Sequence, residues 1–287
     1  MNRRLHGFLF VGTFLLCYTV LLIYPLLMGL NISLHRADLF GARRWVGFDN
    51  YARLLGDPVF GQSLLNTFKL AGMIVPTLTL ITLLLALALN RATRGAAIFR
   101  GVFFSSSVLS VTIVTLIWRF ILTPDAGLVA VVLKALGREP VPFLSDPNLT
   151  IPALAITTIW WSLGLPMMLF LAGLQQIPAD MYEAAALDRA SKWTTLTRIT
   201  LPSLRRTLVL VVMLQTAAQL QIFGQAQLLT AGGPAGASRP VVLFIYEVAF
   251  GRWELGYAIA AAEILFMLVL AVTLIQYLTT RGGEAAR

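Results

Sequence analysis

Six apolar stretches, each long enough to cross a lipid bilayer as a helix, restrict the fold of this 287-residue sequence more than any other feature. They cover residues 8–30, 67–89, 102–122, 151–174, 208–229 and 257–278. A helix of about 20 apolar residues crosses the hydrocarbon layer of a bilayer, which is roughly 30 Å thick. Because unpaired backbone polar groups are costly in lipid, such stretches predict helices. We therefore predict an all-α membrane protein with six transmembrane helices.

The composition agrees with this prediction. The chain is 58% hydrophobic and 12% charged, with a mean hydropathy of +0.80, which is too little polar surface to cover a soluble protein of this size. The net charge of +9 comes from basic residues spread over several short loops. Such a distribution indicates membrane orientation rather than nucleic-acid binding. We expect membrane lipid, and no nucleic acid, around this protein.

The basic residues also predict the orientation in the membrane. If both termini lie on one side, the loop at 91–100 and the segment at 175–206 share that side with them. Basic residues outnumber acids on this face, whereas the opposite loops are balanced. By the positive-inside rule this face is cytoplasmic. We expect a multi-pass protein of the bacterial cytoplasmic (inner) membrane with both termini in the cytoplasm.

A polar and basic segment at residues 182–202 separates two of the apolar stretches. On a helix, Glu183, Ala184, Ala185 and Asp188 present small side chains along one side and acids on the other. This arrangement allows a partner surface to approach closely while its cations meet the carboxylates. The segment therefore suggests a docking element, although a solvated interfacial helix would show much the same pattern.

The same region resembles a known family. Residues 171–204 read LAGLQQIPADMYEAAALDRASKWTTLTRITLPSL. This stretch is similar to the "EAA" loop of membrane subunits in bacterial ATP-binding-cassette (ABC) importers, in the sugar-permease branch that includes the maltose and glycerol-3-phosphate systems. Four more stretches look like the corresponding parts of the first-type, maltose-permease-like subunit, namely NYARLLGDPVFGQSLLNTFKLA, IFRGVFFSSSVLSVTIVTLIWRFI, QLLTAGGPAGASRPVVLFIYEVAF and WELGYAIAAAEILFM.

The resemblance covers nearly the whole chain and implies the type I ABC importer permease fold. It divides the chain into residues 1–62 (a first transmembrane helix and an outer loop), 63–279 (the permease domain, with a coupling loop at about 175–206) and 280–287 (a cytoplasmic tail). It further implies a permease subunit for ATP-driven, binding-protein-dependent import of a sugar or sugar-like solute. The partners would be a second, homologous permease subunit forming a heterodimer, two copies of a cytoplasmic ABC ATPase and an extracytoplasmic solute-binding protein.

The resemblance implies that the loop docks in a cleft of the ATPase. The residues implied to couple the two subunits are Glu183, Ala184, Ala185, Asp188, Arg189, Ala190, Leu201 and Pro202. Arg189 stands where the family usually has Gly, which permits a tight turn, and Arg206 stands where Pro is common. ATP and Mg²⁺ would bind to the ATPases, because this chain has no GxxxxGK[ST] loop to hold phosphates. We expect no catalytic residue, metal or cofactor in the chain itself, which would not be an enzyme.

The glutamines Gln215, Gln219, Gln221 and Gln225 in the fifth apolar stretch mark a candidate substrate pathway. On a continuous helix Gln215 and Gln219 lie about 40° apart, as do Gln221 and Gln225, but the two pairs point in different directions. Either pair can face a polar pathway while the other bonds to neighbouring helices. Amides suit hydroxyl-rich, uncharged sugars. The resemblance to sugar permeases favours Gln215 and Gln219.

Two further residues are candidates for the pathway. The ring of Trp161 could stack on the apolar face of a sugar. Glu263 is an ionisable group inside a predicted span, which is functional by default, although a structural pairing would also explain it.

Two other classes of function fit the sequence less well. An ion-coupled secondary carrier usually shows more buried acids and internal symmetry. An intramembrane enzyme needs a reactive constellation, whereas the two histidines, His6 and His35, lie outside the predicted hydrocarbon core.

Overall fold

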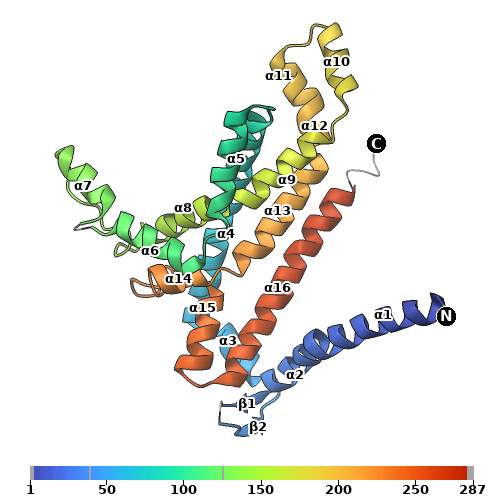
Figure 1. Cartoon of the computed structure of the whole chain (residues 1–287). Coiled ribbons are helices and arrows are strands. Elements are labelled where there is room, and N and C mark those ends of the chain that lie inside the picture. Colours follow the sequence, from blue (N-terminus) through green and yellow to red (C-terminus); the bar gives the residue numbers. More distant parts are fainter. Residues whose placement is uncertain (1–2, 39, 125, 283–287) are drawn as a thin grey trace. The chain divides into compact units, whose positions relative to one another are not determined.

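A computed structural model of the chain describes residues 3–38, 40–124 and 126–282, and these residues are mostly helical (Figure 1). The chain forms two compact units. Unit 1 consists of Met1–Gly61 and Val241–Leu270, and unit 2 consists of Gln62–Pro240 and Ala271–Arg287. Of the tail predicted at 280–287, residues 283–287 lie outside the described part of the chain.

Unit 1 is built from helices and one small hairpin. Its elements are α1 (Arg3–Tyr18), a π-helical turn (Thr19–Ile23), α2 (Tyr24–Ser33), β1 (His35–Ala37), β2 (Arg43–Trp45), α3 (Asp49–Leu55), α15 (Val241–Tyr246), a second π-helical turn (Glu247–Gly251) and the beginning of α16 (Leu255–Gly282). The two strands pair antiparallel. Buried Asn50 of α3 fixes the start of the hairpin, because its side-chain amide donates to the carbonyl oxygens of Ser33 (2.7 Å) and His35 (2.9 Å).

All the regular secondary structure in the described part of unit 2 is helical. It contains most of α4 (Pro58–Leu89), followed by α5 (Arg94–Ser106), α6 (Val111–Leu122), α7 (Leu128–Ala135), α8 (Thr150–Ser162), α9 (Gly164–Gln175), α10 (Ala179–Leu187), α11 (Lys192–Thr195), a π-helical turn (Leu196–Thr200), α12 (Leu201–Ser203), α13 (Arg205–Leu220) and α14 (Gly224–Leu229). The end of α16 also belongs to this unit.

The apolar core of unit 2 lies around α9 and α13. Ala86, Met167, Phe170 and Val211 are fully buried in it. Gly173 explains how closely the two helices approach, since a Cβ there would lie 2.6 Å from the Oγ1 atom of Thr207. Small residues at such crossings allow tight helix packing where lipid supplies no hydrophobic driving force.

Three of the six predicted spans match single long helices. Val11–Ser33, Pro58–Leu89 and Leu255–Thr280 are apolar and long enough to cross a bilayer. The residues that begin α4 explain where that helix starts. Asp57 precedes it as an N-cap, and its Oδ1 atom accepts the backbone N–H groups of Val59 (2.8 Å) and Phe60 (3.3 Å).

The helices in the other three predicted stretches are interrupted. The stretch at 102–122 bends by 97° between α5 and α6. Ser110 begins the new helix there, because its hydroxyl accepts the N–H of Ile113 at 3.4 Å. The stretch at 151–174 bends by 48° between α8 and α9.

The stretch at 208–229 is also interrupted. Helix α13 ends at Leu220 and α14 begins at Gly224. Phe223, between them, has φ −139° and ψ −63°, which lies outside helical geometry. Hydropathy averages over such short breaks, because the residues that form them are apolar or neutral like their neighbours.

Candidate functional sites

The predicted docking segment is a helical loop in unit 2. Figure 1 shows α10 and α11 projecting together beyond the ends of α9 and α13. The chain leaves α9 at Gln175, forms α10 and α11, and returns through the short helix α12 to α13. The segment that the sequence singled out as polar is thus a distinct projection of the fold.

A helix-ending motif sets the turn after α10. The N–H of Arg189 bonds to the carbonyl oxygen of Ala186 (3.1 Å), and that of Ala190 bonds to Ala185 (2.9 Å). These are the two hydrogen bonds of a Schellman motif, whose second-last position requires a left-handed backbone and usually holds glycine. Arg189 occupies it with φ 51°. The turn expected of glycine is therefore formed by an arginine, at a conformational cost.

Two further contacts close the loop. Ser191 caps α11, since its hydroxyl accepts the N–H of Thr194 at 3.1 Å. The hydroxyls of Tyr182 and Thr200 lie 3.2 Å apart and join α10 to the returning chain. Beside this contact is a cavity of about 260 Å³, whose walls come from α10, α11 and the following turn. The loop is therefore an ordered unit.

Most of the predicted coupling residues are accessible. Glu183, Ala184, Asp188, Arg189 and Pro202 are exposed. Ala190 and Leu201 are half-buried, whereas Ala185 is buried. The structure thus leaves seven of the eight at least partly open to a partner, while Ala185 packs inside the loop.

Exposed apolar side chains accompany these residues. Leu187 is 85% exposed and Trp193 is 71% exposed. Leu187 lies four residues after Glu183 and so on the same side of α10. Trp193 was not predicted from the sequence, because a Trp between polar residues near a membrane is also typical of an interfacial anchor. Together they add an apolar surface to the acidic one.

A second candidate site is an uncharged cavity at the break between α13 and α14, whose mostly apolar wall carries a few polar side chains. It has a volume of about 450 Å³. Three amide side chains, a hydroxyl and two aromatic rings contribute to its wall, from Trp161, Ser162, Gln219, Gln221, Phe223 and Gln225. Val111, Ala218, Ile222 and Gly224 complete it. None of these ten residues carries a formal charge, so the cavity offers hydrogen bonds and ring faces.

Two of the four predicted pathway residues meet in this cavity, namely Gln219 and Trp161. Gln215 is buried next to it, where its Oε1 atom accepts a hydrogen bond from the Nε2 atom of Gln219 at 3.3 Å. Trp161 is held in place by its Nε1–H group, which donates to the carbonyl oxygen of Leu109 at 3.0 Å. Gln215 and Leu109 therefore orient the two side chains that line the cavity.

The structure changes the predicted relation between the glutamine pairs. On one continuous helix, Gln219 would point away from Gln221 and Gln225. Because the chain turns between Leu220 and Gly224, all three line the same cavity. The alternation of glutamines was visible in the sequence, but the break that gathers them was not.

Glu263, another of the predicted pathway residues, belongs to unit 1. It lies half-buried on α16 in unit 1, where a Cβ atom added to Gly29 of α2 would lie 3.3 Å from its Oε1 atom. Gln219 and Trp161 belong to unit 2. Within residues 3–38, 40–124 and 126–282, no group of three or more His, Cys, Asp or Glu side chains is arranged to hold a metal ion.

A network of polar side chains ties together the helix ends of unit 1. Arg53 forms an ion pair with Glu254, and its guanidinium carbon lies 4.1 Å from the centre of the Tyr257 ring. The Tyr257 hydroxyl donates to the Oδ2 atom of Asp57 at 2.8 Å. Burial opposes ionisation of Asp57, but this hydrogen bond and those from Val59 and Phe60 outweigh it and lower the pKa of the carboxyl.

Comparisons with known proteins place these features in a family. A family model described as "Binding-protein-dependent transport system inner membrane component" matches residues 52–282. The chain is 33% identical, over 94% of its length and 91% of the relative's, to the trehalose/maltose transport system permease protein MalF of Thermococcus litoralis.

Two solved structures have the same fold. One is a bacterial ABC transporter involved in the import of the acidic polysaccharide alginate, with a TM-score of 0.87 and 23% identity over 97% of this chain and 96% of that one. The other is a bacterial alginate ABC transporter in complex with an alginate pentasaccharide-bound periplasmic protein, with a TM-score of 0.83 and 23% identity over 96% and 94%.

These findings confirm the family resemblance, the all-α fold of a type I ABC importer permease and the expectation that the chain is not the ATPase. The matched region contains both the helical loop at 179–202 and the amide-lined cavity. The chain therefore belongs to the family of binding-protein-dependent transport system inner membrane components.

Proposed function

We propose that this permease subunit moves a neutral sugar, or a sugar-like solute rich in hydroxyl groups, through the amide-lined cavity. The observation that carries the proposal is the meeting of Gln219, Gln221 and Gln225 with the ring of Trp161. Amides both donate and accept hydrogen bonds, as sugar hydroxyls do. The relative from Thermococcus litoralis, whose name refers to trehalose and maltose, supports a sugar as cargo.

The uncharged wall of the cavity also supports a neutral solute. Transfer of an anionic sugar from water into a partly enclosed site is costly unless a cation or several donors compensate for its lost hydration. Among its ten lining residues none is charged. A neutral pyranoside needs only hydrogen bonds and an apolar ring face, both of which the cavity supplies.

We further propose that the loop at 179–202 docks on an ATPase. Exposed Glu183 would pair with a basic residue of that partner, while Leu187 and Trp193 would bury their apolar surface against it. The Tyr182–Thr200 contact keeps the loop ordered, so movement of the docked loop would pass into α13. This coupling would drive alternating access by rigid-body motion.

The proposed assembly follows from family membership. It contains a second, homologous permease subunit, two copies of the ATPase, which bind ATP and Mg²⁺, and an extracytoplasmic solute-binding protein. A periplasmic binding protein is present in one of the structures with this fold. The loop at 179–202 then faces the cytoplasm of a bacterial cell, together with both termini.

The test uses the complex assembled with its partner subunits in liposomes. Solute-dependent uptake and ATP hydrolysis are measured with a panel of neutral oligosaccharides and their uronic-acid counterparts. Gln221→Ala and Gln225→Ala should each raise the KM for the transported solute about 3- to 10-fold, the usual effect of removing one hydrogen bond.

Gln227→Ala is the matched control. Gln227 belongs to α14, like Gln225, but is not among the residues that line the cavity. Its replacement should leave KM within about twofold, since no cavity hydrogen bond is lost. Unchanged KM in the Gln221 and Gln225 variants would remove the cavity from the pathway, and transport of only acidic solutes would contradict the neutral cargo.

A further inference from the structure

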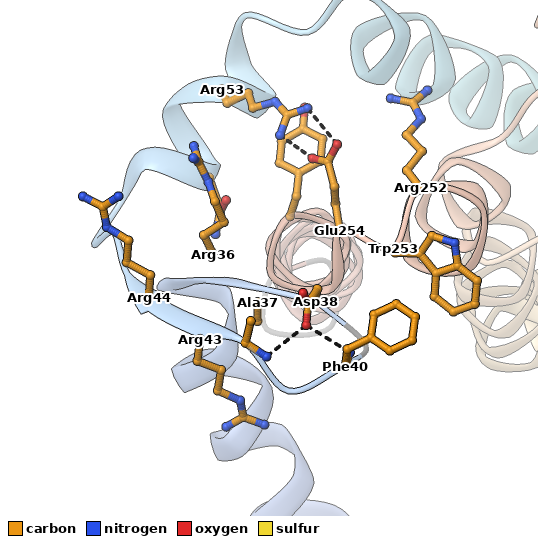
Figure 2. A pocket seen from close by; sticks show the side chains of 13 residues that line it. Arg36, Ala37, Asp38, Phe40, Arg43, Arg44, Arg53, Arg252, Trp253 and Glu254 are labelled. Atoms are coloured by element: carbon orange, nitrogen blue, oxygen red, sulfur yellow. Dashed lines mark hydrogen bonds and ion pairs between the residues drawn. The ribbon is translucent and has the colours of Figure 1, made fainter.

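The hairpin of unit 1 holds two positive charges side by side. Arg36 of β1 lies directly opposite Arg44 of β2 in the antiparallel register. Residues opposite each other project from the same face of a hairpin, with Cβ atoms about 5 Å apart, and like charges in such a pair are destabilising. Figure 2 shows Arg36 and Arg44 on one side of the hairpin, while Arg43 points to the other side.

The acids near this pair are already engaged. The Oδ1 atom of Asp38 accepts the backbone N–H groups of Phe40 and Ala42, both at 3.0 Å. Glu254 is ion-paired with Arg53. Within the described part of the chain, neither Arg36 nor Arg44 forms an ion pair. Among the described residues, their mutual repulsion is therefore not offset by a salt bridge.

The pair borders a cavity of unit 1. It has a volume of about 710 Å³ and lies between the hairpin, α3 and the residues that begin α16. Arg252 adds a further positive charge to its wall, and the rings of Phe40 and Trp253 pack against each other at 5.6 Å between centroids. The cavity is thus open, strongly basic and partly aromatic.

The position of the cavity indicates what occupies it. The candidate span Val11–Ser33 ends just before Arg36, and the candidate span Leu255–Thr280 begins just after Arg252. Residues immediately beyond span ends lie in the headgroup layer, where Trp and Arg are typical. Phosphate groups of lipids are concentrated in that layer, whereas a soluble anion is screened and dilute there.

We propose that Arg36 and Arg44 bind a phosphate group, that of an anionic phospholipid in the leaflet at which these spans end. The planar guanidinium presents two parallel N–H donors to phosphate oxygens, so two opposed arginines can hold one phosphate from both sides. The anion removes the repulsion within the pair, and the cavity accommodates the rest of the headgroup. This lipid site ties the hairpin to the membrane surface.

The test measures lipid binding to the full-length chain in neutral detergent by native mass spectrometry. Phosphatidylglycerol and phosphatidylcholine are titrated separately. The native chain should bind phosphatidylglycerol about tenfold more tightly, and the Arg36→Gln/Arg44→Gln double variant should lose this preference, as expected for two cations near a membrane surface. The Arg36→Lys/Arg44→Lys variant keeps the charge but loses the paired donors, so its preference should be intermediate.

Arg138→Gln is the control, because it removes the same charge from an exposed position that does not line the cavity. It should retain the preference for phosphatidylglycerol. A third titration adds inorganic phosphate at constant ionic strength. If millimolar phosphate displaces the lipid, the arginine pair binds phosphate but its ligand is a soluble anion. If the lipid stays bound, its ligand is the phospholipid.

Two results would overturn the proposal. One is an equal affinity of the native chain for both lipids, or an equal loss of the preference in the Arg138→Gln variant. The other is an unchanged lipid preference in the double glutamine variant together with weaker capture of the solute-binding protein by the assembled complex. The second result would assign this surface to protein docking.

Discussion

The hydroxyl oxygens of Tyr182 and Thr200 lie 3.2 Å apart, and this contact spans the helical loop between α9 and α13. Thr200 is buried and Tyr182 is half-buried, so the contact is shielded from water. It connects α10, where the candidate docking residues lie, to the turn that leads into α13, where Gln219 lies. Under the proposed coupling, movement of the docked loop would pass through this contact toward the helix that borders the cavity.

Removal of this link should weaken coupling more than binding. Tyr182→Phe and Thr200→Val should each destabilise the loop by about 1 kcal/mol, and the double variant should cost less than their sum because they break one hydrogen bond. In the assembled complex, the amount of solute imported per ATP hydrolysed should fall. Thr197→Val is the control, since its hydroxyl bonds only within the preceding turn, to Trp193 (2.8 Å) and more weakly to Thr194. If the amount of solute imported per ATP is unchanged in Tyr182→Phe, in Thr200→Val and in their double variant, this contact has no role in coupling.

Replacing Arg189 by glycine should stabilise the turn. The residue has φ 51°, and a side chain in the left-handed region costs about 1 kcal/mol that glycine avoids. The melting temperature of the detergent-solubilised chain should therefore rise in Arg189→Gly. Asp188→Gly is the matched control, because Asp188 has φ −75° and glycine there only adds freedom to the unfolded chain. Arg189→Ala separates the effects of charge and strain, since it removes the guanidinium and keeps the left-handed backbone.

Glu183 should matter for docking and not for folding. Glu183→Ala and Glu183→Lys should reduce co-purification of the ATPase and uptake, with the lysine variant more severe because it places a like charge against the basic partner expected there. Insertion into the membrane should be unchanged. Glu139→Ala, at an exposed acid outside the loop, is the control. Normal uptake in both Glu183 variants would contradict the coupling role.

Unit 1 should lose stability in acid through Asp57. Because hydrogen bonds lower the pKa of its carboxyl in the folded chain, ionised Asp57 stabilises the fold. This contribution is complete above the usual aspartate pKa of about 3.9 and is lost as the pH falls through the lowered value. The difference in melting temperature between the native chain and Asp57→Asn should thus stay constant from pH 7 to about pH 4 and shrink only as the pH falls further, through the lowered pKa. Tyr257→Phe should reduce this pH dependence, since it removes the hydrogen bond from the Tyr257 hydroxyl.

The two candidate sites differ in how far the sequence predicts them. The docking loop is local, and helical spacing is enough to place Glu183 beside Leu187 on one side of α10. The cavity is not local, because Trp161 comes from α8 and Gln219 from α13. Gln221 and Gln225 also line the cavity, but only because the helix is interrupted between Leu220 and Gly224. Hydropathy does not detect this interruption. The sequence alone is therefore enough to locate the loop, whereas the grouping of side chains around the cavity depends on contacts between separate segments.

The sequence by itself determined the membrane-embedded helical class of this protein, its family and the position of its helical loop along the chain. These follow from apolar length and from motif residues, whose effects add up along the chain and need no knowledge of distant contacts. The tertiary structure alone decided that Gln219, Gln221 and Gln225 share a cavity and that Arg36 opposes Arg44. Such neighbours depend on where a helix is capped or turned and on how strands register, which are decided by packing and hydrogen bonds between separate segments.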